Sequence, residues 1–240
     1  MVPLQVIWAR RTQHRATGTS LAAILPIGVV AAATYYFGRS SPQTDLTVAF
    51  FLAVGGIVGA FAGSLAARRI SDRALSMVFA ILLVVVGLKE VYDALNGAAP
   101  HLVGSSVPVL SVRDYALITA GGVVVGIVSG LTGVGGGTLI VPLLGLGFGI
   151  GQRVAQGTSL VALLPTSAIG ALTHHRNGDV NVRAAMWMGG AGAPTAVAGS
   201  ALALWLPQRV LGGLFGLFLV AFAARMWPRR TTPPLEKPLG

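Results

Sequence analysis

Apolar stretches that are long enough to cross a lipid bilayer recur along almost the whole of this 240-residue chain. They lie at about residues 17–37, 46–66, 74–94, 115–132, 138–150, 157–173, 184–205 and 209–227. A helix needs about 20 residues to cross roughly 30 Å of hydrocarbon. Only 10% of the residues are charged, whereas about a quarter is usual in a soluble domain. The sequence therefore predicts an all-α integral membrane protein, a polytopic bundle of about 7–8 spans.

Basic residues gather in short clusters at the ends of these stretches, which is typical of cytoplasmic ends of spans and disfavours nucleic-acid binding. If residues 138–150 cross the bilayer, one side carries 12 Lys and Arg and the other 5; otherwise the counts are 8 and 9. The larger excess of Lys and Arg on one side favours the arrangement in which 138–150 crosses the bilayer. In that arrangement both termini are cytoplasmic and the two halves are inverted. The shortness of 138–150 leaves a half-helix or a re-entrant segment open. We expect a multi-pass protein of the inner (plasma) membrane.

An internal repeat relates the two halves of the chain. With an offset of 139 residues, residues 2–26 align without a gap to 141–165, and 12 of the 25 positions are identical. The identities include a Gly-Thr-Ser-Leu segment and a proline, which apolar composition alone does not reproduce. The sequence thus predicts a duplicated unit. Its parts are residues 1–95 (first repeat), 96–114 (extramembrane linker), 115–228 (second repeat) and 229–240 (polar C-terminal tail).

The first repeat has no counterpart of the helix and glycine segment at 115–137. We therefore expect it to be truncated at its N-terminus, either because the true start lies upstream of Met1 or because the protein works without that helix. The repeat also disfavours a cleaved signal peptide, since residues 17–37 match 156–176 inside the second half.

Four glycines occupy the five positions 133–137. Each costs about 1 kcal/mol relative to alanine in a helix, so we expect the helix to break there. Unwound backbone at membrane depth persists only inside protein or beside a polar cavity, and its free N–H groups suit an anion. Close helix packing is the alternative, and it does suit Gly122, Gly126 and Gly130. We favour a binding or hinge role for the segment, with the candidate residues Ser129, Thr132, Gly133, Gly135, Gly136 and Gly137.

The Gly-Thr-Ser segments are expected to begin helices in both halves, and each is followed by a proline. Hydroxyls at a helix start either cap the helix or donate to a ligand. A proline inside a span marks a kink or a break, and paired broken helices point to a transporter site. The second set of candidate binding residues is therefore Gly157, Thr158, Ser159, Thr19, Ser20, Pro26 and Pro165.

The acidic residues all fall near predicted span ends or in loops: Asp45, Asp72, Glu90, Asp93, Asp114, Asp179 and Glu236. This distribution argues against a cation transporter and suits an anion held by N–H groups, hydroxyls and helix dipoles. The pair His174-His175 is expected in an interfacial loop, not at a metal. We find no nucleophile elbow, P-loop or metal motif, so we predict neither an enzyme nor a cofactor.

These motifs resemble the sulfite exporter TauE/SafE family of membrane permeases. The matching parts are residues 129–144, 152–160, 163–172 and the turn at 177–181. The resemblance implies a duplicated bundle of about eight helices that exports small, often sulfur-containing, anions such as sulfite, sulfoacetate or thiosulfate. We therefore expect a secondary transporter in the lipid bilayer that works by alternating access. Coupled protons and a homo-oligomer stay open, and a non-transporting or inactive truncated membrane subunit is the alternative.

Overall fold

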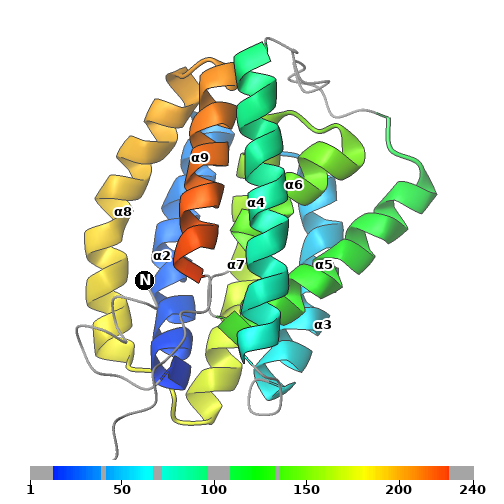
Figure 1. Cartoon of the computed structure of the whole chain (residues 1–240). Helices are drawn as coiled ribbons and strands as arrows, with labels where there is room; N and C mark the ends of the chain where they lie inside the picture. Colours follow the sequence, from blue (N-terminus) through cyan, green and yellow to red (C-terminus); the bar gives the residue numbers. More distant parts are fainter. Residues whose placement is uncertain (1–12, 39–41, 67–71, 97–108, 133–135, 227–240) are drawn as a thin grey trace, which may run out of the picture.

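The computed structural model describes residues 13–38, 42–66, 72–96, 109–132 and 136–226, which form eight α-helices (Figure 1). No strand occurs in this part of the chain. The predicted polar tail and most of the predicted linker lie outside the described residues. The helices are α2 (Gln13–Phe37), α3 (Leu46–Ala66), α4 (Asp72–Asn96), α5 (Val112–Thr132), α6 (Gly137–Phe148), α7 (Gln152–Arg176), α8 (Val182–Trp205) and α9 (Gln208–Met226).

Four of the described helices are long and apolar enough to cross a membrane: Thr17–Phe37, Leu46–Ala66, Val112–Leu131 and Gln152–Arg176. Helices α4, α8 and α9 have 25, 24 and 19 residues, so their lengths also suit a bilayer. Helix α6 has only 12 residues, which at about 1.5 Å per residue cover little more than half of the hydrocarbon. The all-α membrane fold is confirmed, and the short segment at 138–150 is a half-length helix.

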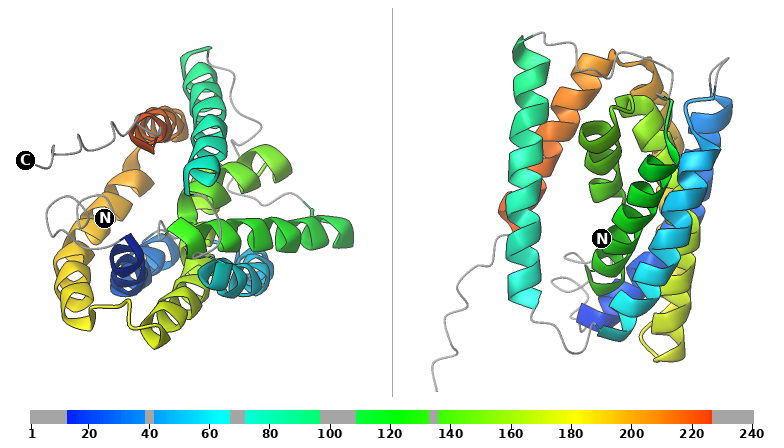
Figure 2. Two further views of the ribbon diagram at one scale, coloured as in Figure 1. Left: turned by 60° about the horizontal axis from the view of Figure 1, so that its bottom comes forward. Right: turned by 90° about the vertical axis from the view of Figure 1, so that its right-hand side faces the viewer.

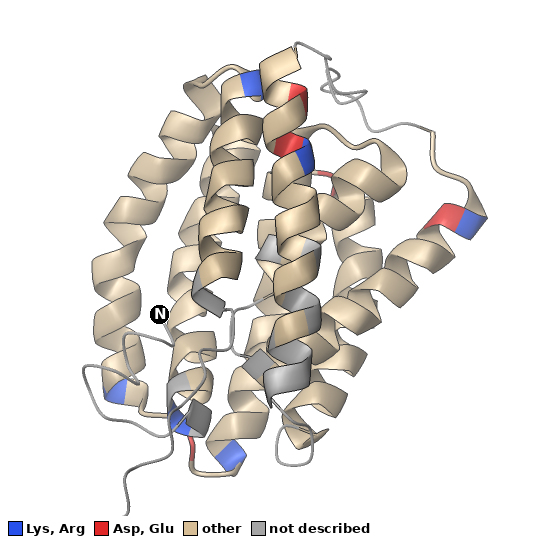
Figure 3. Ribbon diagram, viewed as in Figure 1, with Lys and Arg blue, Asp and Glu red and all other residues tan. Residues whose placement is uncertain are grey.

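The helices alternate in direction. In Figure 1, α2, α4 and α8 run from the lower to the upper end, whereas α3, α7 and α9 run the opposite way. Helix α7 lies inside the bundle, in contact with α2, α3 and α6, while α4 packs chiefly against α9 as an outer pair (Figure 2). The charged residues lie near the two ends of the helices (Figure 3), as a membrane-spanning bundle requires.

Glycines bring α3 and α5 into direct backbone contact. A Cβ atom at Gly59 would meet the carbonyl oxygen of Val123, and one at Gly126 would meet that of Gly56. Neighbouring glycines of both helices make the same kind of contact: Gly55, Gly63, Gly122 and Gly130. The packing role that suits Gly122, Gly126 and Gly130 is confirmed, and the glycines of α3 share it, because only residues without a side chain allow this approach.

Three local predictions are wrong. Helices α2 and α7 begin at Gln13 and Gln152, five residues before the Gly-Thr-Ser segments that were expected to start them. Both helices also continue through Pro26 and Pro165, so neither proline breaks its helix. His174 and His175 belong to the last turn of α7, not to a loop.

Candidate functional site

A cavity of about 400 Å³ lies among α2, α6, α7, α8 and α9. Its polar side chains are Tyr35, Gln156, Ser159 and Ser200, and most of the others are apolar. Since α2 and α7 run in opposite directions, the lining residues 24–35 and 156–163 both lie in the upper half of Figure 1. An apolar hollow with a few convergent polar groups is typical of small-molecule sites.

The N-terminus of α6 opens into this cavity. Gly136, the N-cap residue, has φ of 72° and makes no side-chain cap, a left-handed conformation that favours glycine. Gly137, the first residue of α6, lines the cavity, and nothing lies within 4 Å of the place where its Cβ would be. The first N–H groups of a helix lack acceptors within the helix. The cavity therefore lies at the positive end of a helix dipole, beside N–H groups of Gly137 and Thr138 that have no acceptor within the helix.

A hydrogen-bond network joins α2 and α7 at the cavity wall. The Tyr35 hydroxyl donates to Oε1 of Gln156 over 2.5 Å. The Ser159 hydroxyl donates to the backbone oxygen of Gln156 over 2.7 Å. With Oε1 engaged, Gln156 keeps its amide NH₂ group as a donor, and Ser159 keeps its oxygen as an acceptor.

Thr158 connects α7 to the start of α3. Its Oγ1, on a side chain that is 0% exposed, accepts a hydrogen bond from the backbone N of Asp45 over 2.9 Å. The carboxylate of Asp45 in turn accepts from the backbone N of Val48 over 2.8 Å and so caps α3. Thr158 does not line the cavity.

Thr19 makes the same contact between α2 and the start of α8. Its Oγ1 accepts from the backbone N of Asn181 over 3.1 Å. Asn181 is the N-cap of α8 and accepts from the backbone N of Ala184 over 2.9 Å. Both threonines thus fix the first turn of another helix, and their hydroxyls are not directed at the cavity.

The structure brings together only some of the predicted residues. Gly137 and Ser159 line the cavity, and Gly136 directly precedes Gly137 in the chain. Ser129 is buried behind Gly136, whose Cβ would lie 3.4 Å from the Cβ of Ser129. Ser20 is also buried and does not line the cavity.

The other predicted residues lie elsewhere. A Cβ at Gly157 would meet the carbonyl oxygen of Gln43, so this glycine serves a close backbone approach. Pro26 contacts Gly189 of α8, and Pro165 is half-buried in α7 away from the cavity lining. Thr132 ends α5, but its side chain lies outside the description, as do Gly133 and Gly135.

Sequence reasoning missed Tyr35, Gln156 and Ser200. Gln156 directly precedes the second Gly-Thr-Ser segment, and Ser200 belongs to a Gly-Ser pair that recurs as Gly63-Ser64. These two sequence signals could have identified Gln156 and Ser200. No sequence signal pointed to Tyr35, because its position depends on how α2 packs against α7. Among the described residues, no group of three or more His, Cys, Asp or Glu could hold a metal ion.

The comparison with protein families shows to which functional class the chain belongs. The model of the family described as sulfite exporter TauE/SafE matches residues 1–90 and 118–239. The chain belongs to the sulfite exporter TauE/SafE family. Since this is a family of membrane transporters, the chain is a membrane transporter and not an enzyme.

Relatives of this TauE/SafE member bear names of the same kind. The probable membrane transporter protein YunE of Bacillus subtilis is 26% identical over 75% of this chain and 70% of its own length. A probable membrane transporter protein of Xylella fastidiosa is 31% identical over 73% of this chain and 66% of its own. YdhB of Bacillus subtilis is 35% identical over 36% of this chain, which spans only 35% of that protein. No solved structure matches.

Proposed function

We propose that this chain is a secondary transporter that exports a small, sulfur-containing anion by alternating access, and that the anion binds in the cavity at the start of α6. One observation carries the proposal. The first residue of a helix without a side-chain cap lines a cavity that is otherwise mostly apolar. Inside a membrane the low dielectric strengthens the attraction between an anion and the helix N-terminus.

The chemistry of the lining suits an oxyanion that must also leave. None of the described lining residues is charged, so the site attracts an anion through dipoles and hydrogen bonds without a permanent counter-ion. An oxyanion such as sulfite accepts several hydrogen bonds, for which the α6 N–H groups and the Gln156 amide are donors. Sulfite as the substrate is supported by the family description, and sulfoacetate and thiosulfate share its chemistry.

We also infer that residues 1–95 and 115–228 are inverted repeats. The inference is supported by the matching contacts of Thr19 with Asn181 and of Thr158 with Asp45. It is further supported by helix direction, because α2 and α7, which the repeat equates, run in opposite directions (Figure 1). The described helix ends that flank the Lys- and Arg-rich segments, namely the start of α2 and the ends of α3 and α9, point to the lower end of Figure 1. We assign this end to the cytoplasm of a cell with this protein in its inner membrane.

A substitution at the start of α6 tests the proposal. In proteoliposomes, Gly137→Leu should lower the flux of radiolabelled sulfite at least about tenfold, because the side chain occupies the place of the anion. The matched control is Gly147→Leu near the other end of α6, where nothing lies within 4 Å of the added Cβ either; its flux should equal that of the wild type. Equal flux in both variants would refute the site. No flux of any of these anions in the wild type would instead favour a non-transporting membrane subunit.

A further inference from the structure

Glu90 is a buried carboxylate between α4 and α9. Its side chain is only 7% exposed, although Glu90 lies near the end of α4, as the sequence predicted. Glycines of α9 make room for it: a Cβ at Gly216 would lie 2.9 Å from the Glu90 Cβ, and one at Gly212 would lie 3.1 Å from its Oε2. Close contact between the two helices therefore encloses an ionisable group, which is rare in a membrane protein without a function.

Next to Glu90 lies a pocket of about 10 Å³, room for about one water molecule. Gln152, the first residue of α7, lines this pocket and is 3% exposed. Neither its Nε2 nor its Oε1 has a hydrogen-bond partner in the described part of the chain, and the same holds for Oε1 of Gln208. Leaving such a buried group unsatisfied costs about 1–3 kcal/mol. These amides are therefore the hydrogen-bonding groups that the pocket offers to the Glu90 carboxyl group.

We propose that Glu90 binds and releases a proton and that Gln152 and Gln208 stabilise its protonated form. A protonated carboxyl is a hydrogen-bond donor, and the two amide oxygens that line the pocket are acceptors. An ionised carboxylate needs a donor instead, which the Nε2 group of Gln152 supplies. The pocket thus has groups for both protonation states, and only one proton is exchanged between them.

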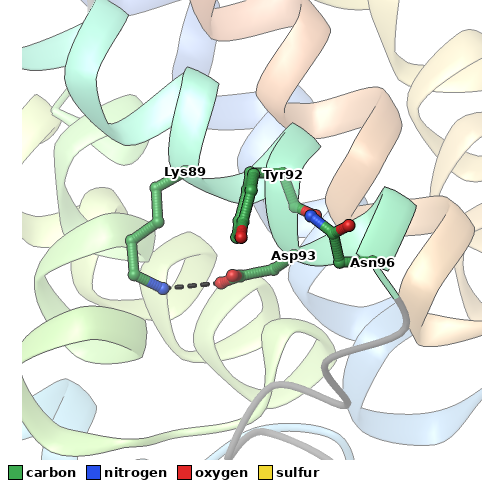
Figure 4. Close-up of polar contacts among 4 residues, drawn as sticks. All are labelled: Lys89, Tyr92, Asp93 and Asn96. Atoms are coloured by element: carbon green, nitrogen blue, oxygen red, sulfur yellow. Dashed lines mark hydrogen bonds and ion pairs between the residues drawn. The ribbon is translucent and has the colours of Figure 1, made fainter.

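The charged side chains that line the Glu90 pocket come from α4 and α9. On α4, Lys89 pairs with Asp93 over 2.6 Å (Figure 4), so these two charges largely compensate each other. From α9, Arg209 lines the same pocket as Glu90 and Asp93. On α7, the guanidinium of Arg153 donates to the carbonyl oxygen of Leu206.

Helix α7 connects this pocket to the cavity. Gln152 and Gln156 are four residues apart and lie on one face of the helix. The first lines the Glu90 pocket and the second lines the cavity at the start of α6. The protonation of Glu90 therefore acts on the same helix that holds the proposed anion site. Its coupling to transport rests on the proposed function, whereas proton binding itself does not.

Infrared spectroscopy of the reconstituted protein tests proton binding directly. In addition to the bands of the other acidic residues, a carbonyl stretching band of a buried protonated carboxylic acid should appear and disappear with pH in the wild type, and Glu90→Gln should remove this band. The matched control is Asp114→Asn, which alters an acidic residue that is bonded to Ser111 at the start of α5; this variant should keep the band. A spectrum in which Glu90→Gln keeps the titrating band would overturn the proposal.

Sulfite flux in proteoliposomes tests the coupling. A pH gradient should accelerate sulfite flux in the wild type, and Glu90→Gln should abolish this acceleration while sulfite exchange without a gradient persists. If Glu90→Gln responds to the gradient like the wild type, the coupling is refuted and the transport proposal stands. If the wild type moves no sulfite but the band titrates, the transport proposal fails and the proton site stands. Acceleration by a sodium gradient alone, without a titrating band, would assign the pocket to sodium and overturn the proton site.

Discussion

Helices α3 and α8 occupy corresponding places in the proposed repeat. Helix α3 has a described helix, α5, packed against the face that carries Gly63, whereas the place of Gly199 on α8 is open. Gly63 of α3 faces the backbone of α5, where an added Cβ would meet the carbonyl oxygen of Ile127. Its counterpart on α8, Gly199, has nothing within 4 Å and lines the cavity. No described helix takes the place on α8 that α5 takes on α3. The cavity therefore lies beside α8, where no described helix packs in the way that α5 packs against α3.

The same contrast separates the side chains next to these glycines. Ser64 is buried, and its Oγ lies 3.0 Å from the place of a Cβ on Gly130 of α5. On the same side, the ring of His174 lies 3.3 Å from the carbonyl oxygen of Gly130. Ser200 and Tyr35, at the matching positions, line the cavity instead. Packing against α5, more than the lining residues themselves, decides which of two similar surfaces is hollow.

Adding one methyl group to each of the two matched glycines should give the largest difference. Gly63→Ala should destabilise the protein by about 1–3 kcal/mol, because the methyl group forces apart two backbones that touch. Gly199→Ala fills open space and replaces a helical glycine, so its stability should rise slightly. Thermal unfolding of the purified proteins in detergent measures both. Equal destabilisation would mean that α8 is covered as closely as α3.

Thr19 and Thr158 should behave alike, because the proposed repeat places them at matching positions and they make matching contacts. Thr158→Val and Thr19→Val should each lower stability by about 1 kcal/mol, because each removes a buried hydroxyl that accepts a hydrogen bond from a backbone N–H. The KM for sulfite should not change in either variant. A raised KM for Thr158→Val with unchanged stability would indicate that Thr158 is an anion ligand, as the sequence suggested. Thr158 and Thr19 would then not have the same structural role.

The sequence predicts the elements well but not their partners. The apolar stretch at 46–66 coincides with α3, and the glycine spacing of α3 and α5 indicates packing faces because both follow from local periodicity. The role of Thr158 could not be inferred, since its partner Asp45 lies 113 residues away in the chain. For the same reason the burial of Glu90 depends on the glycines of α9, which no local pattern connects to it.

Thiol labelling at one pair of matched serines tests the central claim, that an anion binds in the cavity at the start of α6. The chain has no cysteine, so Ser159→Cys and Ser20→Cys each introduce a single thiol, the first on the cavity wall and the second at a side chain that is 0% exposed. A small methanethiosulfonate reagent should modify Ser159→Cys, sulfoacetate should slow that reaction in a saturable way, and Ser20→Cys should stay unmodified. Modification of Ser159→Cys at a rate that saturating sulfoacetate does not change, or equal modification of both thiols, would contradict the account.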